Sequence, residues 1–244
     1  MEELLAIVRG TKLISVCMAT FNGERYLKEQ IDSILPQLQE DDELIISDDG
    51  STDETLVILK QYETDPRVKL LTGPKRGLIK NFEHVLSAAK GDIIFLSDQD
   101  DVWLPNKVAR VVATFNAQPK CLAVLSDLQI TTEDLKIIEP SFFAAKKVKV
   151  GIIRNIIRNT YIGAGLALRK ELLKQALPFP DKLPMHDMWI GLLAGRQVLL
   201  LPEVLTLYRR HGDNASELET TTSFTQKLRW RLDLIGALIR RRTV

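Results

Sequence analysis

The sequence predicts an α/β protein of the Rossmann-like kind, with a mostly parallel central sheet flanked by helices. Short apolar runs alternate with helix-like segments through the first half of the chain, as in repeated βαβ units. The chain has 244 residues, which is enough for one domain with a sizeable core. We therefore expect a single domain over residues 1–223, followed by a C-terminal amphipathic helix over residues 224–244.

The first half of the chain is expected to contain four strands, each leading into a helix. The expected strands cover residues 12–18, 43–47, 68–71 and 92–97, and the expected helices cover 24–35, 53–62, 77–90 and 106–115. In the first of these helices, Leu27, Ile31 and Ile34 recur at helical spacing on one face. Polar loops rich in acids, Asn or Gly follow most of the strands. Because ligands gather outside the carboxyl ends of parallel strands, these loops should converge on one side of the sheet.

The second half of the chain has a looser pattern of the same kind. Strands are expected at residues 121–130, 135–139 and 204–211, and a helix at 186–195. Residues 163–177 are expected to form a strand that runs into a helix. No linker separates this half from the first, so both halves are expected to complete one site.

The composition is that of a soluble globular protein. A net charge of +1 gives no whole-protein argument for nucleic-acid binding. Cys17 and Cys121 lie far apart in apolar runs, so we expect two buried thiols rather than a disulfide. The N-terminus lacks the basic region of a secretory signal, and no run of about 18 apolar residues could span a bilayer. These features predict a cytoplasmic protein.

The stretch FLSDQDDVWLP, residues 95–105, places three carboxylates directly after an apolar strand. Asp98, Asp100 and Asp101 repel one another, and an ordinary strand end needs none of them. An Asp-x-Asp pair at the carboxyl end of a strand is an efficient ligand for a hard cation such as Mg²⁺ or Mn²⁺. Such ions usually connect one or two carboxylates to substrate phosphates. The alternative is a loop whose geometry and solvent simply tolerate the cluster.

A second acidic pair, Asp48 and Asp49, follows the strand expected at 43–47 and precedes Gly50. Asp-Gly-Ser is ordinary turn chemistry, because an Asp side chain can accept hydrogen bonds from the next backbone N–H groups. For this pair a turn and a ligand-binding role are equally good explanations.

Several classes of phosphate-handling protein can be compared with the sequence. No G-x-x-x-x-G-K-[ST] is present, which excludes a P-loop NTPase. No G-x-G-x-x-G follows the first strand, which argues against a dinucleotide-dependent dehydrogenase. A phosphatase or receiver domain with an Asp nucleophile remains possible. A nucleotidyltransferase would need a Gly-rich first loop that ends in a basic residue, and ATFNGERYL fits this poorly.

Six blocks, in order over roughly residues 12–215, resemble the family 2 inverting glycosyltransferases of the GT-A fold. The blocks are SVCMATFNGERYLKEQIDSIL, ELIISDDGSTDET, GDIIFLSDQDDVW, GAGLALRKELL, HDMWIGLLA and YRRHGDNAS. Within that family, SDQDDVW and HDMW are most similar to bacterial rhamnosyltransferases of cell-wall, capsule or O-antigen assembly.

The resemblance implies roles for the residues that match family motifs. Ala19, Thr20 and Phe21 occupy the loop that lines the nucleotide base, where the family usually has Pro-Thr-Tyr. Phe21 can stack on a pyrimidine but lacks the tyrosine hydroxyl. Asp49 matches the carboxylate that reads the base N–H, and Asp98 matches the contact to the ribose or the metal.

Further matches concern the metal and the reaction. Asp100 matches the principal metal ligand, and His211 matches a position that completes the metal site or contacts the diphosphate. Asp187 lies where the family keeps its catalytic base, with His186 in place of the frequent Glu. Lys80 could contact the diphosphate, although a solvated surface charge explains it equally well.

The chemistry of inverting transfer explains these residue types. The acceptor hydroxyl attacks the anomeric carbon on the face opposite to the departing nucleoside diphosphate. A metal neutralises charge on that diphosphate, and a carboxylate takes the acceptor proton, a role that typically contributes about 10²–10⁴-fold. From the sequence alone, Asp187 could instead cap the helix that it begins, and His211 could be a solvated loop residue.

The C-terminal segment FTQKLRWRLDLIGALIRRR predicts an amphipathic helix. Its apolar stripe would consist of Phe224, Leu228, Leu232, Ile235 and Ile239. Six cations, namely Lys227, Arg229, Arg231 and residues 240–242, accompany the single acid Asp233. This pattern fits a helix attracted to anionic lipid, and packing on the domain or on another subunit is an equal alternative.

Together these features predict a metal-dependent inverting glycosyltransferase that uses Mg²⁺ or Mn²⁺. The expected donor is dTDP-L-rhamnose, and the expected acceptor is a glycan or lipid-linked saccharide of bacterial cell-surface polysaccharide synthesis. A UDP-hexose donor is the main alternative; the others are a sugar-nucleotide-forming nucleotidyltransferase and a catalytically silent binding module. We expect a cytoplasmic protein, in possible peripheral contact with the anionic inner face of the cell membrane, and no nucleic-acid partner.

Overall fold

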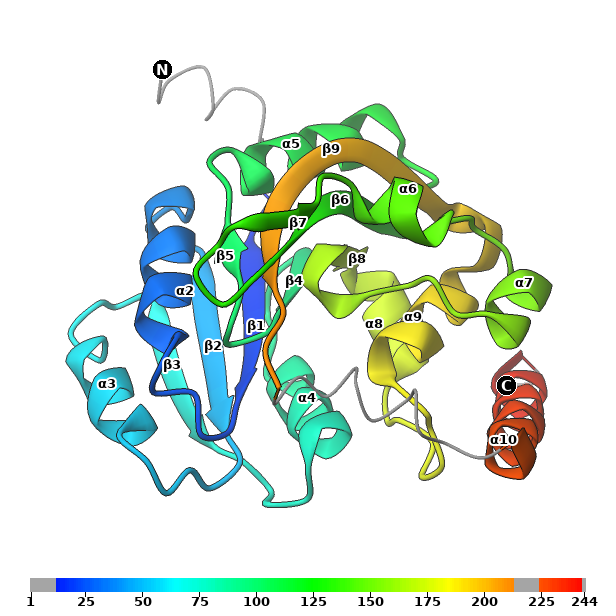
Figure 1. Ribbon diagram of the computed structural model, residues 1–244, viewed down its shortest axis with the longest axis horizontal. Helices are drawn as coiled ribbons and strands as arrows, with labels where there is room; N and C mark the ends of the chain where they lie inside the picture. The colour runs from blue at the N-terminus through cyan, green and yellow to red at the C-terminus, as the bar shows by residue number, and fades with distance from the viewer. Residues whose placement is uncertain (1–11, 213–223, 243–244) are drawn as a thin grey trace.

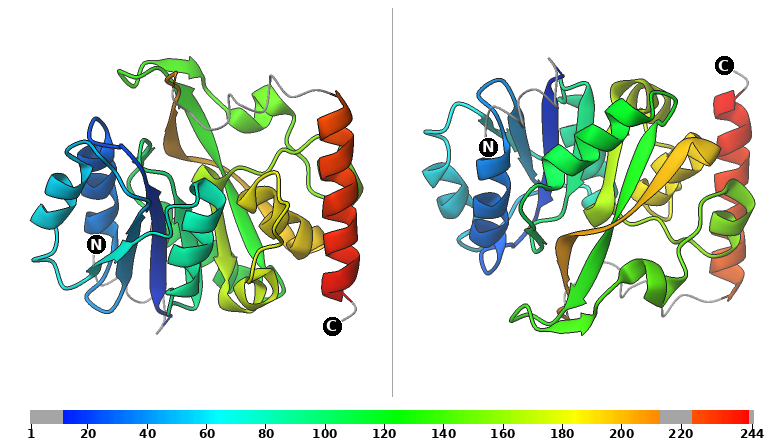
Figure 2. Two further views of the ribbon diagram at one scale, coloured as in Figure 1. Left: turned by 90° about the horizontal axis from the view of Figure 1, so that it is seen from below. Right: turned by 90° about the horizontal axis from the view of Figure 1, so that it is seen from above.

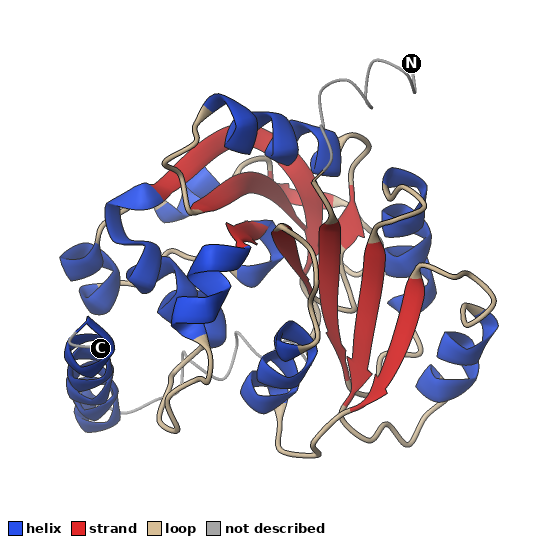
Figure 3. Cartoon of the chain, turned by 180° about the vertical axis from the view of Figure 1, so that it is seen from behind, coloured by secondary structure: helices blue, strands red, loops and turns tan. Residues whose placement is uncertain are grey.

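The computed structural model describes residues 12–212 and 224–242, and within the last segment the side chains of residues 229–241. Nine strands in this part of the chain form one sheet with helices on both faces (Figures 1 and 3). The strands are β1 (Ile14–Thr20), β2 (Glu43–Asp48), β3 (Val68–Thr72), β4 (Ile93–Ser97), β5 (Val102–Trp103), β6 (Ala123–Thr131), β7 (Ile137–Glu139), β8 (Leu166–Arg169) and β9 (Val198–Arg209). The predicted α/β class is confirmed.

The helices alternate with these strands along the chain. They are α2 (Leu27–Ile34), α3 (Thr55–Gln61), α4 (Leu78–Ser87), α5 (Lys107–Ala117), α6 (Phe142–Lys146), α7 (Ile152–Ile157), α8 (Lys170–Ala176), α9 (His186–Ala194) and α10 (Phe224–Arg242). Short 3₁₀ turns lie at Leu35–Gln37, Gly163–Gly165 and Gly195–Gln197. The sequence pattern did not predict β5, α6 or α7, and it began the last strand at residue 204, six residues later than the start of β9.

The first half of the sheet is parallel, as the alternating pattern predicted. β1 pairs in parallel with both β2 and β4, and β2 pairs in parallel with β3. The second half is mixed, because β8 runs antiparallel to both β4 and β6, whereas β6 and β9 are parallel. The strand order across the sheet is β3-β2-β1-β4-β8-β6-β9-β5, with β7 paired to β6. The carboxyl ends of β1, β2 and β4 therefore lie side by side.

Helices on both faces explain why β1 is buried along its whole length and mainly apolar. Ile14, Val16 and Met18 belong to one hydrophobic core, and Cys17 and Ala19 belong to the other. Successive side chains of a strand point to opposite faces, and a strand covered on both faces has no solvent side that would favour polar residues. The mainly apolar run in the sequence, interrupted by Ser15, is the direct result.

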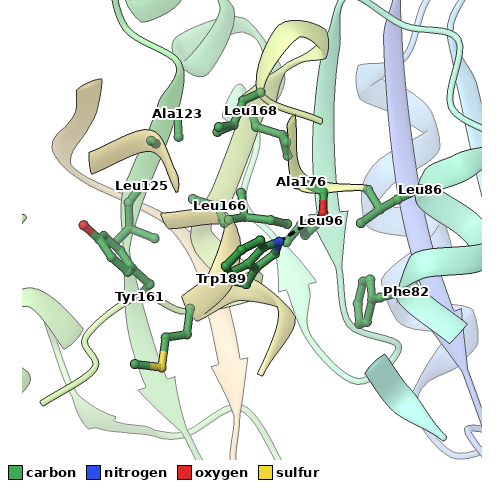
Figure 4. Packing of buried hydrophobic residues seen from close by; sticks show 14 of the residues in the cluster. Phe82, Leu86, Leu96, Ala123, Leu125, Tyr161, Leu166, Leu168, Ala176 and Trp189 are labelled. Carbon is green, nitrogen blue, oxygen red and sulfur yellow. Dashed lines mark hydrogen bonds between the residues drawn. The ribbon is translucent and has the colours of Figure 1, made fainter. Parts of the chain in front are cut away.

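Trp189 on α9 lies at the centre of the larger core (Figure 4). Its indole N–H donates a hydrogen bond to the carbonyl oxygen of Ala176 at 3.0 Å. Further along the same helix, the ring of Tyr161 packs on Gly191, where a Cβ atom would come within 2.4 Å of the ring. This close packing holds the segment that leads to Gly163 against the first turns of α9.

Both cysteines are buried and free, which confirms the expectation of two buried thiols. Among the described residues, no helix is both long enough and apolar enough to cross a bilayer.

The C-terminal helix α10 packs on the domain and also keeps an apolar face in solvent. Leu234, Ala237 and Leu238 are buried in the larger core. Leu232 and Ile239, which belong to the predicted stripe, are 62% and 61% exposed. The other predicted stripe residues are Ile235, which is exposed, and Phe224 and Leu228, which with Lys227 lie outside the described side chains. Figure 2 shows α10 at the opposite end of the molecule from the β1–β3 half.

Candidate functional site

A cavity of about 1080 Å³ opens at the carboxyl ends of β1, β2 and β4. Seven of the nine predicted site residues line it: Ala19, Thr20, Phe21, Asp49, Asp98, Asp100 and Asp187. These residues come from four separate segments of the chain, so the fold brings them together. The volume is at the upper end of the range typical of small-molecule sites.

Lys80 is the predicted site residue that the structure keeps apart from this group. Its ammonium lies 2.6 Å from a carboxylate oxygen of Glu83 on the same helix and 3.8 Å from one of Asp181. The basic side chain that lines the cavity on this side is Lys75, in the loop before α4. Contact between Lys80 and a diphosphate remains a prediction.

Gln99 fixes the loop that carries Phe21. Its side-chain amide donates to the carbonyl oxygen of Phe21 at 3.0 Å, and its carbonyl oxygen accepts from the Phe21 N–H at 2.9 Å. Two residues after Phe21 lies Gly23, where a Cβ atom would come within 2.4 Å of the same amide. The Phe21 ring is 55% exposed and lines the cavity, so it is free to stack on a planar ligand.

The two acids after β2 have different roles. Asp48 forms the turn, because one carboxylate oxygen accepts from the N–H groups of Gly50 and Ser51 at 3.0 and 2.8 Å. Asp49 faces the cavity and organises the next loop by accepting 2.7 Å hydrogen bonds from the N–H groups of Lys75 and Gly77. The oxygen that accepts from Lys75 also accepts from the Arg76 N–H at 3.4 Å, so the oxygen that accepts from Gly77 is the one with a second lone pair for a ligand N–H.

Behind Asp49 lies a buried amide that sequence reasoning did not single out. Asn81 donates to the carbonyl oxygens of Ser47 at 2.8 Å and Thr20 at 3.3 Å. It thereby joins the ends of β1 and β2. Its own carbonyl oxygen is buried without a hydrogen-bond partner, and the residue lines the cavity.

The three carboxylates after β4 have different surroundings. Asp98 lines the cavity, Asp100 both lines it and meets His211, and Asp101 is fully buried. Burial, together with the nearby charges of Asp100 and Asp187, raises the pKa of Asp98 to about 7. Burial and the neighbouring Asp100 and Asp98 also raise the pKa of Asp101. The crowding that the sequence suggested is therefore real in the fold.

The end of β9 holds this acidic loop in place. The backbone N–H of Arg209 donates to Asp101 at 3.1 Å, and its guanidinium Nε donates to the carbonyl oxygen of Asp100 at 2.8 Å. The same guanidinium lies over the ring of Tyr26, 4.5 Å from its centre. His211 follows two residues later, with its Nε2 atom 2.8 Å from a carboxylate oxygen of Asp100.

Lys107 places a buried amino group beneath the acidic loop. Its ammonium donates to the carbonyl oxygen of Ala164 and the hydroxyl of Thr206, both at 2.7 Å, and lies 4.1 Å from the centre of the Trp103 ring. Burial lowers the pKa of Lys107 to about 7, although Asp101 and Asp98 act in the opposite direction. These contacts join Lys107 to Ala164, Thr206 and Trp103, so the role that they give Lys107 is to support the buried side of the acidic loop.

Asp187 lies in the first turn of α9, and the N-cap position is Met185. One carboxylate oxygen accepts from the N–H of Gly163 at 2.9 Å, and the other accepts from the N–H of Met188 at 2.5 Å. Asp187 thus satisfies one N–H of the helix start and also ties α9 to the segment at Gly163. The structure shows a positioned carboxylate at the cavity wall.

Gly163 is where the metal-side acid and the proposed base approach each other. A Cβ atom at Gly163 would lie 3.9 Å from a carboxylate oxygen of Asp98 and 3.9 Å from the Cβ atom of Asp187. It would also lie 3.6 Å from Nε2 of His186. The missing side chain leaves room between the three groups.

His186 is a buried polar residue in an apolar setting. Its ring stacks on Phe82 with 3.9 Å between ring centres, and neither ring nitrogen has a hydrogen-bond partner. Burial lowers the pKa of His186 to about 3, so the imidazole is neutral at physiological pH. It cannot supply a positive charge at the site.

A divalent cation can be tested against these donors. Within residues 12–212 and 224–242, no group of three His, Cys, Asp or Glu side chains is arranged as a metal cluster. The closely paired Asp100 and His211 offer one carboxylate oxygen, a donor type that suits Mg²⁺ and Mn²⁺, and one imidazole nitrogen. Because Mg²⁺ is typically held by one or two carboxylates plus substrate phosphates, a pair with Asp98 nearby is a sufficient protein contribution.

Residues 15–177 match the family model described as glycosyl transferase family 2. The chain belongs to glycosyl transferase family 2. The match contains the loops after β1, β2 and β4. The match ends before Asp187 and His211. The places of these two residues therefore rest on the geometry described above.

Curated relatives of this family 2 chain are longer than the chain itself. It is 30% identical over 213 residues to an uncharacterized glycosyltransferase of Nostoc sp., covering 82% of this chain and 66% of the relative. It is also 30% identical over 219 residues to the hyaluronan synthase of Pasteurella multocida, covering 86% of this chain and 22% of the synthase. The chain thus spans only part of each relative.

Solved structures confirm the GT-A-like fold of this family 2 domain. S. aureus TarS in complex with UDP-GlcNAc superimposes with a TM-score of 0.70 at 19% identity, covering 92% of this chain and 66% of that chain. Glucosyl-3-phosphoglycerate synthase of Mycobacterium tuberculosis, in complex with Mn²⁺, UDP and glucosyl-3-phosphoglycerate, gives 0.64 at 21% identity, with coverages of 99% and 84%.

Several residues of the site were not predicted from the sequence. Gln99 and Asn81 act through hydrogen bonds to other segments of the chain. Gly163 acts through the space that its missing side chain leaves. Gln99 could have been suspected from its place inside the Asp-x-Asp pair. Trp230 and Arg231 of α10 also line the cavity, and only the packing of α10 on the domain reveals this.

Proposed function

We propose that this chain transfers a sugar from a nucleoside diphosphate donor to an acceptor hydroxyl, with inversion at the anomeric carbon. The observation that supports it is the single cavity that collects the base-side loop, the Asp98–Asp100 acids and Asp187. Family membership supports the same reaction class. An inverting displacement needs a charge-stabilising group at the leaving diphosphate and a base on the opposite side, and the Asp98–Asp100 acids and Asp187 are the candidates for these two roles.

The base-side loop would hold the nucleotide. Phe21 offers an exposed aromatic face at the cavity wall, and Asp49 offers carboxylate lone pairs for a base N–H. Both lie on loops that are pinned by hydrogen bonds to the backbone. Such preorganisation reduces the entropy that is lost when a ligand binds.

Asp100 and His211, with Asp98 beside them, would hold Mg²⁺ or Mn²⁺. The mycobacterial synthase was solved with Mn²⁺ and UDP, which supports a divalent cation in this role. When bound, the cation neutralises charge that develops on the departing diphosphate. Arg209 donates to the carbonyl oxygen of Asp100, and the Tyr26 ring lies 5.0 Å from the His211 ring between centres, so both residues support the Asp100–His211 pair.

Asp187 would accept the proton of the attacking hydroxyl. Its carboxylate is held at the cavity wall by the N–H groups of Gly163 and Met188. The space at Gly163 lies between Asp187 and Asp98, which is where the transferred sugar must sit if the diphosphate is on the metal side.

The donor we propose is dTDP-L-rhamnose, with a UDP-hexose as the alternative. The resemblance of SDQDDVW and HDMW to rhamnosyltransferases supports the first. The solved neighbours bind UDP or UDP-GlcNAc, which supports the second. The proposed acceptor is a glycan or lipid-linked saccharide of a bacterial cell surface, which places the enzyme in the cytoplasm at the inner face of the membrane.

One assay tests the reaction class and the donor. The purified chain is incubated with a panel of nucleotide sugars, Mg²⁺ or Mn²⁺, and saccharide acceptors, and released nucleoside diphosphate and pyrophosphate are both measured. We expect nucleoside diphosphate that disappears when EDTA is added. Pyrophosphate release from a nucleoside triphosphate would identify a nucleotidyltransferase instead. Tight nucleotide-sugar binding without turnover across the panel would identify a binding module.

A further inference from the structure

The charges of this protein are segregated to one end, although the chain as a whole is nearly neutral. Residues 140–160, which contain α6 and α7, hold five cations and no acid. Residues 229–241 of α10 hold four cations and one acid. These two segments therefore carry a net charge of +8, and the remainder of a chain with a net charge of +1 carries −7.

The same two segments expose large aliphatic side chains. Ile153 and Ile157 on α7 are 78% and 64% exposed, and Leu232 and Ile239 on α10 are 62% and 61% exposed. Single exposed apolar residues are ordinary on a protein surface, whereas a group of them beside a charge cluster marks an interaction site. We call the exposed residues of α7 and α10, with the cations of residues 146–158, the cationic–apolar face.

The two helices of this face are joined to each other and to the cavity. The guanidinium of Arg231 donates to the carbonyl oxygens of Ile156 and Ile157 at 3.1 and 2.7 Å. Ile157 and Trp230 also line the cavity. Figures 1 and 2 show α7 and α10 together at one end of the molecule. The open side of the cavity and the cationic–apolar face are therefore adjacent.

We infer that the cationic–apolar face docks on the surface of an anionic lipid bilayer. Aliphatic side chains can enter the headgroup region while Lys and Arg side chains contact lipid phosphates. A second copy of the chain is the weaker candidate, because pairing this face with itself would bring two clusters of like charge together. In the orientation that results, the cavity faces the bilayer, so an acceptor of the proposed transferase would be a saccharide carried on a lipid.

Co-sedimentation with vesicles tests the docking without any donor or metal. The full chain is mixed with vesicles of phosphatidylcholine alone or of phosphatidylcholine with phosphatidylglycerol. We expect binding to the anionic vesicles only, weakened by added salt because screening reduces the attraction. Since the assay contains no substrate, its outcome is independent of whether the transferase activity is found.

Two double variants test the cationic–apolar face, and neither replaces a residue that lines the cavity. Leu232→Ser with Ile239→Ser removes apolar contact, and Lys147→Gln with Lys149→Gln removes two charges. Each basic side chain near an anionic surface contributes about 1 kcal/mol, so the second pair should weaken binding by about 10-fold or more. Substitution is preferable to truncation, because Leu234 and Leu238 of the same helix are buried in the core.

Matched controls lie outside the cationic–apolar face. Leu56→Ser with Val57→Ser changes two apolar residues of α3 that are 45% and 53% exposed, and Lys60→Gln with Lys120→Gln changes two exposed cations. The controls should bind as the wild type does, and thermal melting should show all four variants folded. Absence of binding to anionic vesicles, or equal binding by folded face variants and controls, would overturn the inference. Capture of an acidic protein in place of lipid would do the same.

Discussion

The two sides of the cavity are built in different ways. On the nucleotide side, three loops at the ends of parallel strands are fixed by side-chain hydrogen bonds to backbone groups, through Gln99, Asp48 and Asp49. On the opposite side, the wall comes from α9, α7 and α10, with apolar and cationic side chains. The first side is rigid and specific in its donors and acceptors, and the second is broad and partly exposed. Under the proposed function, this difference predicts tight control of the donor and a looser fit for the acceptor.

The largest expected effect lies on the metal side. Asp100→Asn replaces a charged ligand by a neutral amide and also changes the contact to His211. Mutation of groups that merely support a metal ligand typically costs 10–100-fold, so loss of the ligand should weaken metal-dependent donor binding by at least about 100-fold. Calorimetric titration with nucleoside diphosphate and Mn²⁺ measures this. Wild-type affinity in Asp100→Asn, beside an unaffected Asp41→Asn control, would remove Asp100 from the metal site.

The next effect concerns Asp187 and compares binding with turnover. Asp187→Asn should leave donor binding intact and reduce kcat by about 10²-fold or more, the scale of a lost general base. The structure adds a complication, because an Asn NH₂ group would face the N–H of Gly163 or of Met188. Thermal unfolding and donor titration must therefore accompany the rate measurement. Near-normal turnover in a stable variant would assign Asp187 a purely structural role.

A third prediction concerns the imidazole of His186, which lies on the side of the cavity formed by α7, α9 and α10 and has no hydrogen-bond partner. The pKa of His186 is lowered to about 3 in the fold from an ordinary value of 6.5, so the unfolded chain binds this proton more readily. The free energy of unfolding should then fall as the pH drops from about 6.5 toward 3, by up to about 2 kcal/mol at pH ~5. His186→Phe keeps the ring stacked on Phe82 and removes this proton uptake.

The measurement is a difference in urea unfolding between wild type and His186→Phe, at pH ~7 and pH ~5. Asp98 and Asp101, whose pKa values are raised, act in the opposite direction in both proteins and largely cancel in the difference. A wild-type curve parallel to that of the variant would mean that His186 gains a partner or solvent contact in solution.

The smallest effect tests how firmly the nucleotide side is fixed. Gln99→Ala removes two hydrogen bonds to the Phe21 backbone, each worth about 0.5–1.5 kcal/mol. We expect the KM for the donor to rise several-fold to about 10-fold, with kcat nearly unchanged. Gln99→Glu is the matched variant, because it keeps the bond from the Phe21 N–H but sets a second oxygen against the Phe21 carbonyl. If neither variant changes the KM, the loop is held by other contacts.

The nucleotide side was also the more predictable side from the sequence. Its strands and helices alternate with clear periodicity, and its acids stand at strand ends, where topology alone brings them together. The position of Asp187 opposite Asp98 depended on the resemblance to a family, because nothing in the local pattern near residue 187 predicts a meeting across the sheet. The role of Gln99 depends on a contact with a residue 78 positions away, which no local pattern encodes.

The helical side was predicted less well for a physical reason. The short helices α6 and α7 have five and six residues, too few for a periodic signal. The apolar stripe predicted for α10 includes Leu232 and Ile239, which are exposed, whereas the buried contacts come from Leu234, Ala237 and Leu238. A helix with apolar residues on two faces does not reveal which face packs, and only the neighbouring elements decide it.

Substitution of Gly163 offers a way to measure how large a sugar the proposed site accepts. An added methyl at this position would meet its neighbours at 3.6–3.9 Å, which is ordinary van der Waals contact, and the backbone there is not one of the positive-φ glycines. Gly163→Ala should therefore fold without adjustment while narrowing the gap between the two sides of the cavity by one carbon atom. Donors that differ only in the bulk of one sugar substituent would then be graded by size. The dimensions of the sugar subsite could be read from kinetics before any complex is crystallised.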